Sequence, residues 1–174
     1  MTKNVYDEIR ERETKGSGNT QIPLLPGIQK KEFSNLTDAV RSGSKEDVRS
    51  FLLKQKNISR TSLTRLLCIA ASFNPNAEVM GYLIEMGADV YHRDCWTGNT
   101  ILHKAARSNP HVGVLDYLIK KNINVDAQGK HYQTALHFAA QYNPNIDVLK
   151  YLIDIGASKN VYDSSGNVRR YWLC

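Results

Sequence analysis

A few histidines and cysteines are the side chains of this chain that could act as nucleophiles, general bases or metal ligands. Cys95 follows His92 by three residues, and a cysteine beside a histidine can form an activated thiolate or half of a metal site. No third ligand is evident near this pair, and the sequence has no phosphate-binding loop, zinc-protease or serine-hydrolase signature. His103 and His137 are the other candidates for acid–base chemistry, each in a Leu-His-x-Ala-Ala segment. The sequence therefore predicts neither an enzyme nor a bound metal or cofactor.

The cysteines and the apolar runs bear on where the protein works. The three cysteines, at positions 68, 95 and 174, are odd in number and lack Cys-x-x-Cys spacing, which argues against a disulfide framework. The longest apolar run covers residues 66–71, far short of the ~20 residues that cross a bilayer. The first residues contain no apolar core of a secretory signal. We therefore expect a cytoplasmic or nuclear protein without a membrane span.

Basic residues are concentrated in one short part of the chain. The formal net charge is +6, and residues 33–66 carry seven Lys or Arg against three Asp or Glu. One interpretation is a contact for nucleic acid or for an acidic partner. The other is a solvated outer face, which we favour because the charge elsewhere is nearly balanced. Only Phe33 and Phe51 could stack on bases within this region, so nucleic acid is not the expected partner.

The sequence repeats itself at a nearly constant interval. Residues 100–126 placed on residues 134–160, an offset of 34, give twelve identities among 27 positions. An offset of 35 brings the segment that begins at Leu67 onto the one that begins at Leu102. Three copies of one unit predict a stack of similar elements, because a unit of this length cannot bury its apolar face alone.

Each copy predicts two helices joined by a sharp turn. In the middle copy, residues 102–106 indicate a first helix, whose Ala-Ala pair lets a neighbouring helix approach closely. An Asn-Pro pair ends it, because proline lacks an amide hydrogen and keeps the preceding residue out of helical angles. Residues 114–119 carry apolar side chains at helical spacing and predict the second helix. Its end is predicted at Asn122, a position that Gly87 and Gly156 take in the other copies, since both residue types tolerate positive φ.

Two copies carry the pattern T-x-L-H-x-A-A, starting at Thr100 and at Thr134, and residues 82–90 read Tyr-Leu-Ile-Glu-Met-Gly-Ala-Asp-Val. These motifs resemble the first-helix signature and the second-helix ending of ankyrin repeats. The resemblance covers about residues 34–167. It implies an all-α solenoid of stacked helix–turn–helix units with short β-hairpin loops.

The resemblance also suggests how the chain is divided. Residues 1–32 form an N-terminal extension, a charged helix with a Gly/Pro linker, which is either disordered or covers the first repeat. Residues 33–174 form the ankyrin-repeat domain. Its expected parts are a degenerate repeat at about 34–60, repeats at about 65–98, 99–132 and 133–165, and a C-terminal cap at 166–174.

The second repeat departs from the family pattern. Arg65 and Cys68 stand where the other copies have the threonine and the histidine of the signature. Cys68 is therefore expected to be a small buried side chain. In ankyrin repeats the signature histidine forms hydrogen bonds between neighbouring repeats, so the resemblance implies a structural role for His103 and His137.

The resemblance implies a concave binding face made of hairpin tips and first helices. Equivalent positions in successive repeats place aromatic and basic side chains there, and such side chains often dominate the energy of an interface. The predicted partner-binding residues are Phe73, Trp96, Lys104, Arg107, His131, Tyr132, Phe138 and Tyr142. For Phe73 and Phe138, packing into the gap between repeats is an equally good interpretation.

The expected function is that of a non-catalytic protein–protein interaction module, an adaptor or an inhibitor, whose partner is another protein. Neither the identity of that protein nor the oligomeric state follows from the sequence. Small free-standing proteins of this kind also resemble effectors that are delivered into eukaryotic host cells. Two alternatives are a binder of nucleic acid or of an acidic partner through the basic first repeat, and an enzyme with a cysteine-dependent site.

Overall fold

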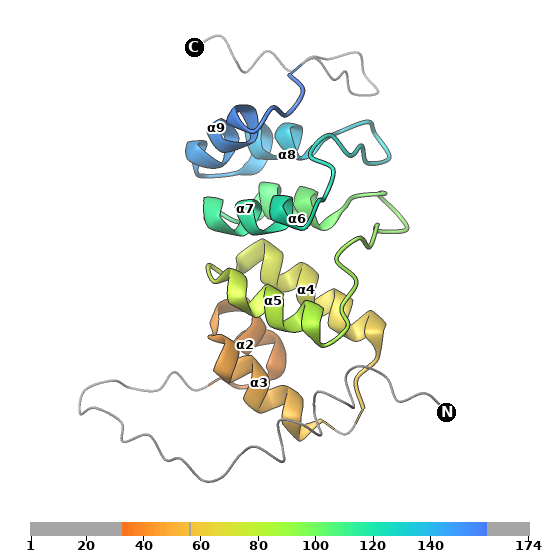
Figure 1. Cartoon of the computed structure of the whole chain (residues 1–174), viewed down its shortest axis with the longest axis vertical. Helices are drawn as coiled ribbons and strands as arrows, with labels where there is room; N and C mark the ends of the chain where they lie inside the picture. Colours follow the sequence, from red (N-terminus) through yellow and green to blue (C-terminus); the bar gives the residue numbers. More distant parts are fainter. Residues whose placement is uncertain (1–32, 56, 160–174) are drawn as a thin grey trace, which may run out of the picture.

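The computed structural model describes residues 33–55 and 57–159, so the expected extension at 1–32 and cap at 166–174 lie outside the described residues. Within this part, the chain forms eight α-helices and no β-strand. The helices are α2 (Leu36–Ser42), α3 (Lys45–Lys54), α4 (Arg60–Phe73), α5 (Ala77–Glu85), α6 (Ile101–Ser108), α7 (Val112–Lys120), α8 (Ala135–Tyr142) and α9 (Ile146–Asp154). Figure 1 shows them as successive pairs stacked along the long axis of the molecule. The predicted all-α solenoid is confirmed.

Long loops connect the later pairs, and we call residues 91–99 and 126–133 the tip loops. The predicted β-hairpins are reduced here to one isolated antiparallel bridge between Arg93 and Thr100, the only β pairing among the described residues. The first tip loop turns tightly between these residues. The Gly98 amide donates to the Asp94 carbonyl at 2.7 Å, and the Asp94 amide donates to the Asn99 carbonyl at 3.0 Å.

The second helices end where the sequence predicts. Gly87, Asn122 and Gly156 follow α5, α7 and α9 with φ angles of 103°, 58° and 89°. In this left-handed region glycine is unstrained and asparagine is tolerated better than most residues. The same three positions therefore turn the chain out of the helix after each unit.

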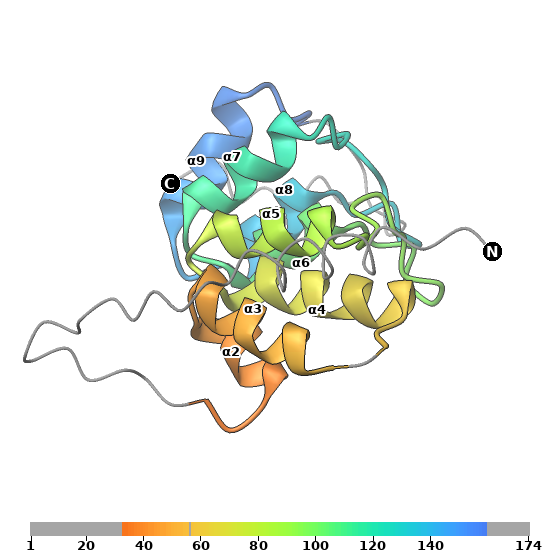
Figure 2. The same cartoon turned by 60° about the horizontal axis from the view of Figure 1, so that its bottom comes forward.

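Helix α4 is longer than its counterparts, with 14 residues against 8 in α6 and 8 in α8. In α6 and α8, Thr100 and Thr134 are the N-cap residues. Helix α4 instead begins earlier, at an N-cap formed by Ser59, so that Arg65 lies inside the helix. In Figures 1 and 2 the N-terminal end of α4 extends to the side of the molecule on which the tip loops lie. The second repeat therefore lacks the signature threonine because its helix does not begin at that residue.

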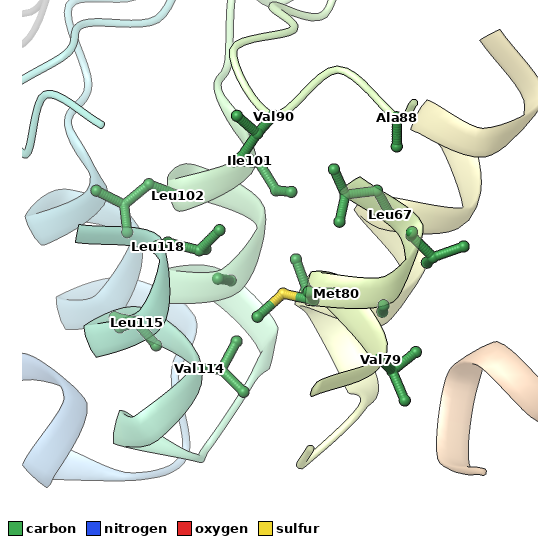
Figure 3. Packing of buried hydrophobic residues seen from close by; sticks show 14 of the residues in the cluster. Leu67, Val79, Met80, Ala88, Val90, Ile101, Leu102, Val114, Leu115 and Leu118 are labelled. Atoms are coloured by element: carbon green, nitrogen blue, oxygen red, sulfur yellow. The ribbon is translucent and has the colours of Figure 1, made fainter. Parts of the chain in front are cut away.

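The core is a continuous layer of aliphatic side chains between successive helix pairs. Figure 3 shows Met80 of α5 between its own repeat and the next, with Val114 and Leu118 of α7 on the side that faces it. First helices pack directly on first helices, α4 on α2 and on α6, and α6 on α8. The Ala-Ala pairs make this approach possible, since Ala70 and Ala105 are fully buried at these contacts.

Buried asparagines join each repeat to the one before it. These are the residues that precede proline in the Asn-Pro turns, and the sequence analysis gave them a role only in ending the first helix. Each side-chain amide donates two hydrogen bonds of 2.8–3.0 Å to backbone carbonyls of the preceding repeat. The sets are Asn74 with Val40 and Gly43, Asn109 with Ala71 and Asn74, and Asn143 with Ala106 and Asn109. We call these bonds the asparagine ladder.

The ladder also fixes the turn in which each asparagine lies. The Asn109 carboxamide oxygen accepts from the amide of His111 at 3.0 Å, and Asn74 and Asn143 accept in the same way from the second residue after them. Because Asn74 and Asn109 are fully buried, water cannot replace these bonds. One side chain thus holds its own turn and the neighbouring repeat together.

The ladder predicts a large loss of stability on Asn109→Ala. The substitution leaves the carbonyls of Ala71 and Asn74 without these buried donors, so the free energy of unfolding should fall by about 2–4 kcal/mol. Urea denaturation followed by circular dichroism measures the change. Asn57→Ala, at an exposed position, is the matched control and should cost less than about 0.5 kcal/mol. Equal losses in the two variants would contradict the importance of the ladder.

Candidate partner-binding surface

Four of the predicted partner-binding residues are exposed aromatic side chains. Phe73 and Tyr142 lie at the last turns of α4 and α8 and are 44% and 46% exposed, whereas Trp96 and Tyr132 lie in the tip loops and are 80% and 56% exposed. Large rings at this exposure contribute little to the core. First helices and tip loops therefore present the rings on the surface where the sequence analysis expected them.

Arginine side chains hold two of these rings. The guanidinium of Arg41, from α2, lies 4.1 Å from the ring centroid of Phe73, and that of Arg107, from α6, lies 4.7 Å from the ring centroid of Tyr142. Each pair joins the ends of first helices in consecutive repeats. A cation over an aromatic face contributes about 0.5–1 kcal/mol at an exposed site and restricts both side chains. We call these two pairs the arginine–aromatic pairs; the sequence analysis missed the role of Arg41.

Phe138 is not part of the exposed surface, and its assignment as a contact residue is corrected. It is only 8% exposed and packs edge-on against His103 with ring centroids 5.6 Å apart. Its other neighbour is Tyr142, at 6.0 Å between centroids. Of the two interpretations, packing between repeats is therefore the right one for Phe138, while Phe73 remains at the surface. The reason is that Phe138 follows the signature histidine on the side of α8 that faces α6.

The tip loop that carries Trp96 is held by one carboxylate. Asp94 Oδ1 accepts from the amides of Trp96 and Thr97 at 3.1 and 3.0 Å and from the Thr97 hydroxyl at 3.1 Å. These bonds, chiefly that from the Thr97 amide, lower the pKa of Asp94. Lys104 Nζ lies 3.8 Å from Asp94 Oδ2, which ties α6 to the same loop. Trp96 is thus an exposed indole on a loop whose backbone is fixed.

Tyr132 adopts a backbone conformation that costs energy. Its φ of 57° lies in the left-handed region, where Gly98 stands in the preceding tip loop with a φ of 64°. A side chain there costs about 1–2 kcal/mol. The offset of 34 aligns Tyr132 with Gly98, so the strained conformation of Tyr132 could have been predicted from a tyrosine at a glycine position. The exposed His131 lies beside Tyr132.

The structure brings the predicted residues into two groups rather than one continuous patch. Arg107 and Tyr142 are joined on the first helices. The two tip loops touch each other, because the Lys130 amide donates to the Thr97 carbonyl at 2.6 Å. Lys104, half-buried, stands between α6 and the first of these loops.

The signature histidine has the structural role that the resemblance implied. His103 Nδ1 accepts from the Thr100 amide at 3.1 Å, so the proton is on Nε2, which donates to the Gln133 carbonyl of the next repeat at 3.0 Å. Burial lowers the pKa of His103 and keeps the ring neutral, as this arrangement requires. The His103 imidazole therefore joins its own repeat to the next one.

The cysteines are placed differently from one another. Cys95 is exposed, and Cys68 is half-buried rather than fully buried as expected. Burial raises the pKa of the Cys68 thiol, which favours its unreactive protonated form. In the part of the chain that the structure describes, no group of three His, Cys, Asp or Glu side chains is arranged to hold a metal ion.

Several cations of the basic first repeat contact rings or a carboxylate. Lys45 Nζ lies 5.6 Å from the ring centroid of Tyr82, and Lys54 Nζ lies 5.6 Å from that of Phe51. Arg60 Nη2 lies 3.7 Å from Asp89 Oδ2. Each of these three cations thus has a partner within the fold.

Comparison with known protein families gives one match. The model of ankyrin repeats matches residues 67–163 in three copies. No curated protein is similar enough to count as a relative. Among the described residues, no helix has the length and apolar character needed to cross a bilayer.

The buried hydrogen bond between His103 and the Gln133 carbonyl predicts that the stability of the fold depends on pH. Because the pKa of His103 is lowered in the fold, the unfolded chain binds its proton more readily. Stability should be full above the unfolded-state pKa of about 6.5 and should fall as the pH drops below it. Urea denaturation at pH 7.5 and 5.5 should show this loss in the wild type and a smaller loss in His103→Gln. His131→Gln, at an exposed site, is the control and should lose as much stability as the wild type does. If His103→Gln also lost as much as the wild type, His103 would not be the cause of the pH dependence.

The strain at Tyr132 predicts that a smaller residue stabilises the fold. Tyr132→Gly removes about 1–2 kcal/mol of left-handed strain and adds about 0.5–1 kcal/mol of chain entropy to the unfolded state. The variant should therefore be as stable as the wild type or more stable, by up to about 1 kcal/mol, in guanidinium denaturation. Tyr91→Gly is the control and should be destabilised, since it loses the bond from the Tyr91 hydroxyl to the Lys121 carbonyl. If Tyr132→Gly were less stable than the wild type, the backbone of Tyr132 would not be strained as we infer.

Proposed function

Because the chain belongs to the ankyrin-repeat family, we propose that it is a non-catalytic adaptor or inhibitor that grips a partner protein through its first helices and tip loops. Ankyrin repeats are in general protein–protein interaction modules, and three of them span residues 67–163 of this chain. The mechanism would be occlusion, bridging or competition. Delivery into a eukaryotic host cell stays an expectation based on the family resemblance alone.

The exposed aromatic rings are the observation that carries this proposal. Trp96 and Tyr132 of the tip loops and Tyr142 at the end of α8 are large exposed rings, and Tyr132 is exposed at a cost in backbone strain. Strain at an exposed side chain is typical of residues retained for function. Aromatic and arginine side chains are also the types that most often dominate interface energy.

The way these rings are held supports tight recognition. Arg107 fixes Tyr142, and Asp94 fixes the loop of Trp96, so little side-chain freedom remains to be lost on binding. The stack itself is joined through buried side chains at every repeat, which favours binding with little backbone change. The partner would thus meet a preformed surface.

The test compares proteins retained by two immobilised variants from an extract of the native host. Trp96→Ala/Tyr132→Ala/Tyr142→Ala removes three exposed rings and should lower recovery of the specific partner at least tenfold, because hot-spot truncations cost about 2 kcal/mol or more each. Circular dichroism and thermal unfolding confirm that the variant remains folded.

Ile146→Ala is the matched control, since it truncates a large exposed side chain on the second helix α9, outside the first helices and tip loops. It should retain the same partners as the wild type. Equal recovery of every retained protein by the wild type and the triple variant would refute the proposed surface.

A further inference from the structure

A cavity of about 510 Å³ lies beside the N-terminal half of α4. Its wall is formed by the N-terminal half of α4, by Asp89, by His92 and Asp94 of the first tip loop, and by Lys104 of α6. Cys68 and Ile69, both half-buried, also line it. Of the lining residues, Lys104 was a predicted partner contact, and Arg60 and Arg65 belong to the basic region that could meet an acidic partner.

The cavity exists because the second repeat departs from the others. In the third repeat, the His103 ring fills the space under the next tip loop and bonds to the Gln133 carbonyl. The equivalent residue in the second repeat is Cys68, which is too short to span that space. Helix α4 also begins six residues earlier than α6 does in the repeat alignment, and its additional turns form one wall. The additional wall and the missing ring together leave a hollow.

The basic side chains around this cavity do not form direct hydrogen bonds with the carboxylates that also line it. Arg60 Nη2 lies 3.7 Å from Asp89 Oδ2, and Lys104 Nζ lies 3.8 Å from Asp94 Oδ2. Both distances exceed that of a direct hydrogen bond. Arg65 is exposed on the same wall.

One oxygen of each carboxylate is meanwhile occupied by amides of its own loop. Asp94 Oδ1 accepts three hydrogen bonds, including those from the amides of Trp96 and Thr97, and Asp89 Oδ1 accepts from the Tyr91 amide at 3.0 Å. The cations at the mouth are therefore better placed than the carboxylates to meet a ligand group, and the ligand charge that complements them is negative.

We propose that this cavity receives an acidic segment of the partner protein, with an Asp or Glu carboxylate between Arg60, Arg65 and Lys104 and an adjacent aliphatic side chain against Cys68 and Ile69. The inference rests on the proposed function, since it assumes a protein partner. A single carboxylate or a small inorganic anion would leave most of the volume empty. Inside the cavity a base would meet no aromatic side chain other than a histidine, whereas Cys68 and Ile69 suit an aliphatic side chain.

The cavity is continuous with the surface of exposed rings. Ile69 lies one turn before Phe73 on α4, and Lys104 lies one turn before Arg107 on α6. Asp94 takes part in both regions, since it lines the cavity and fixes the loop of Trp96. One extended segment of a partner can therefore occupy the cavity and contact the rings.

The test uses a random peptide library displayed on phage and selected on the immobilised full-length chain. Selected peptides should share an acidic residue next to an aliphatic one. Synthetic copies should bind the wild type and should bind Arg60→Gln/Arg65→Gln at least tenfold more weakly, measured by fluorescence anisotropy. Raising the salt from 50 to 500 mM should also weaken binding, because the contact is between charges. Glutamine is a good helix former, so the variant keeps α4.

Lys120→Gln/Lys150→Gln is the matched control, because it removes the same charge at two ion-paired lysines of the second helices. It should bind the peptides as the wild type does. Equal losses in the two variants, or selected peptides without an acidic residue, would overturn the inference.

The ring variant Trp96→Ala/Tyr132→Ala/Tyr142→Ala separates the two proposals. Peptides lost by the ring variant but kept by Arg60→Gln/Arg65→Gln would leave the proposed function standing and overturn the acidic segment. Selection of no peptide at all would count against both.

Discussion

Backbone hydrogen bonding at the turns is the constraint on which the stack depends. Each first helix ends with carbonyls that its own helix cannot satisfy. The asparagine ladder supplies the donors from the next repeat, with two bonds from each of Asn74, Asn109 and Asn143. Because these groups are buried, the spacing and the angle between repeats follow from side-chain geometry as well as from aliphatic packing.

The tip-loop side of the stack has its own links, and together with the ladder they fix the tip loops and first helices that form the proposed binding surface. His103 joins the third repeat to the Gln133 carbonyl, and the Lys130 amide joins one tip loop to the other. The second repeat lacks the histidine link, and the cavity lies at that place. The irregular repeat is thus where the surface is hollowed, and it carries exposed rings at Phe73 and Trp96 as well.

The sequence was sufficient for the architecture but only partly for the surface. Periodicity, the Asn-Pro turns and the residues at Gly87, Asn122 and Gly156 predicted the helices and their ends, because these depend on local chemistry. The burial of Phe138 and the contact of Arg41 with Phe73 depend on how neighbouring repeats are placed, which no single repeat encodes. Ser59, a good N-cap residue, explains the early start of α4. The cavity that this start leaves beside Cys68 depends on how three elements pack and is seen only in the structure.

The asparagine ladder has a direction. Every amide of the ladder reaches back toward lower residue numbers, and the position equivalent to Asn74 in the first repeat is Gly43, whose carbonyl only accepts. A stack without its last repeat ends in backbone acceptors, whereas a stack without its first repeat ends in side-chain amide donors that have lost their protein acceptors. The order in which a ribosome releases the chain is therefore the order in which each new repeat finds its acceptors already in place.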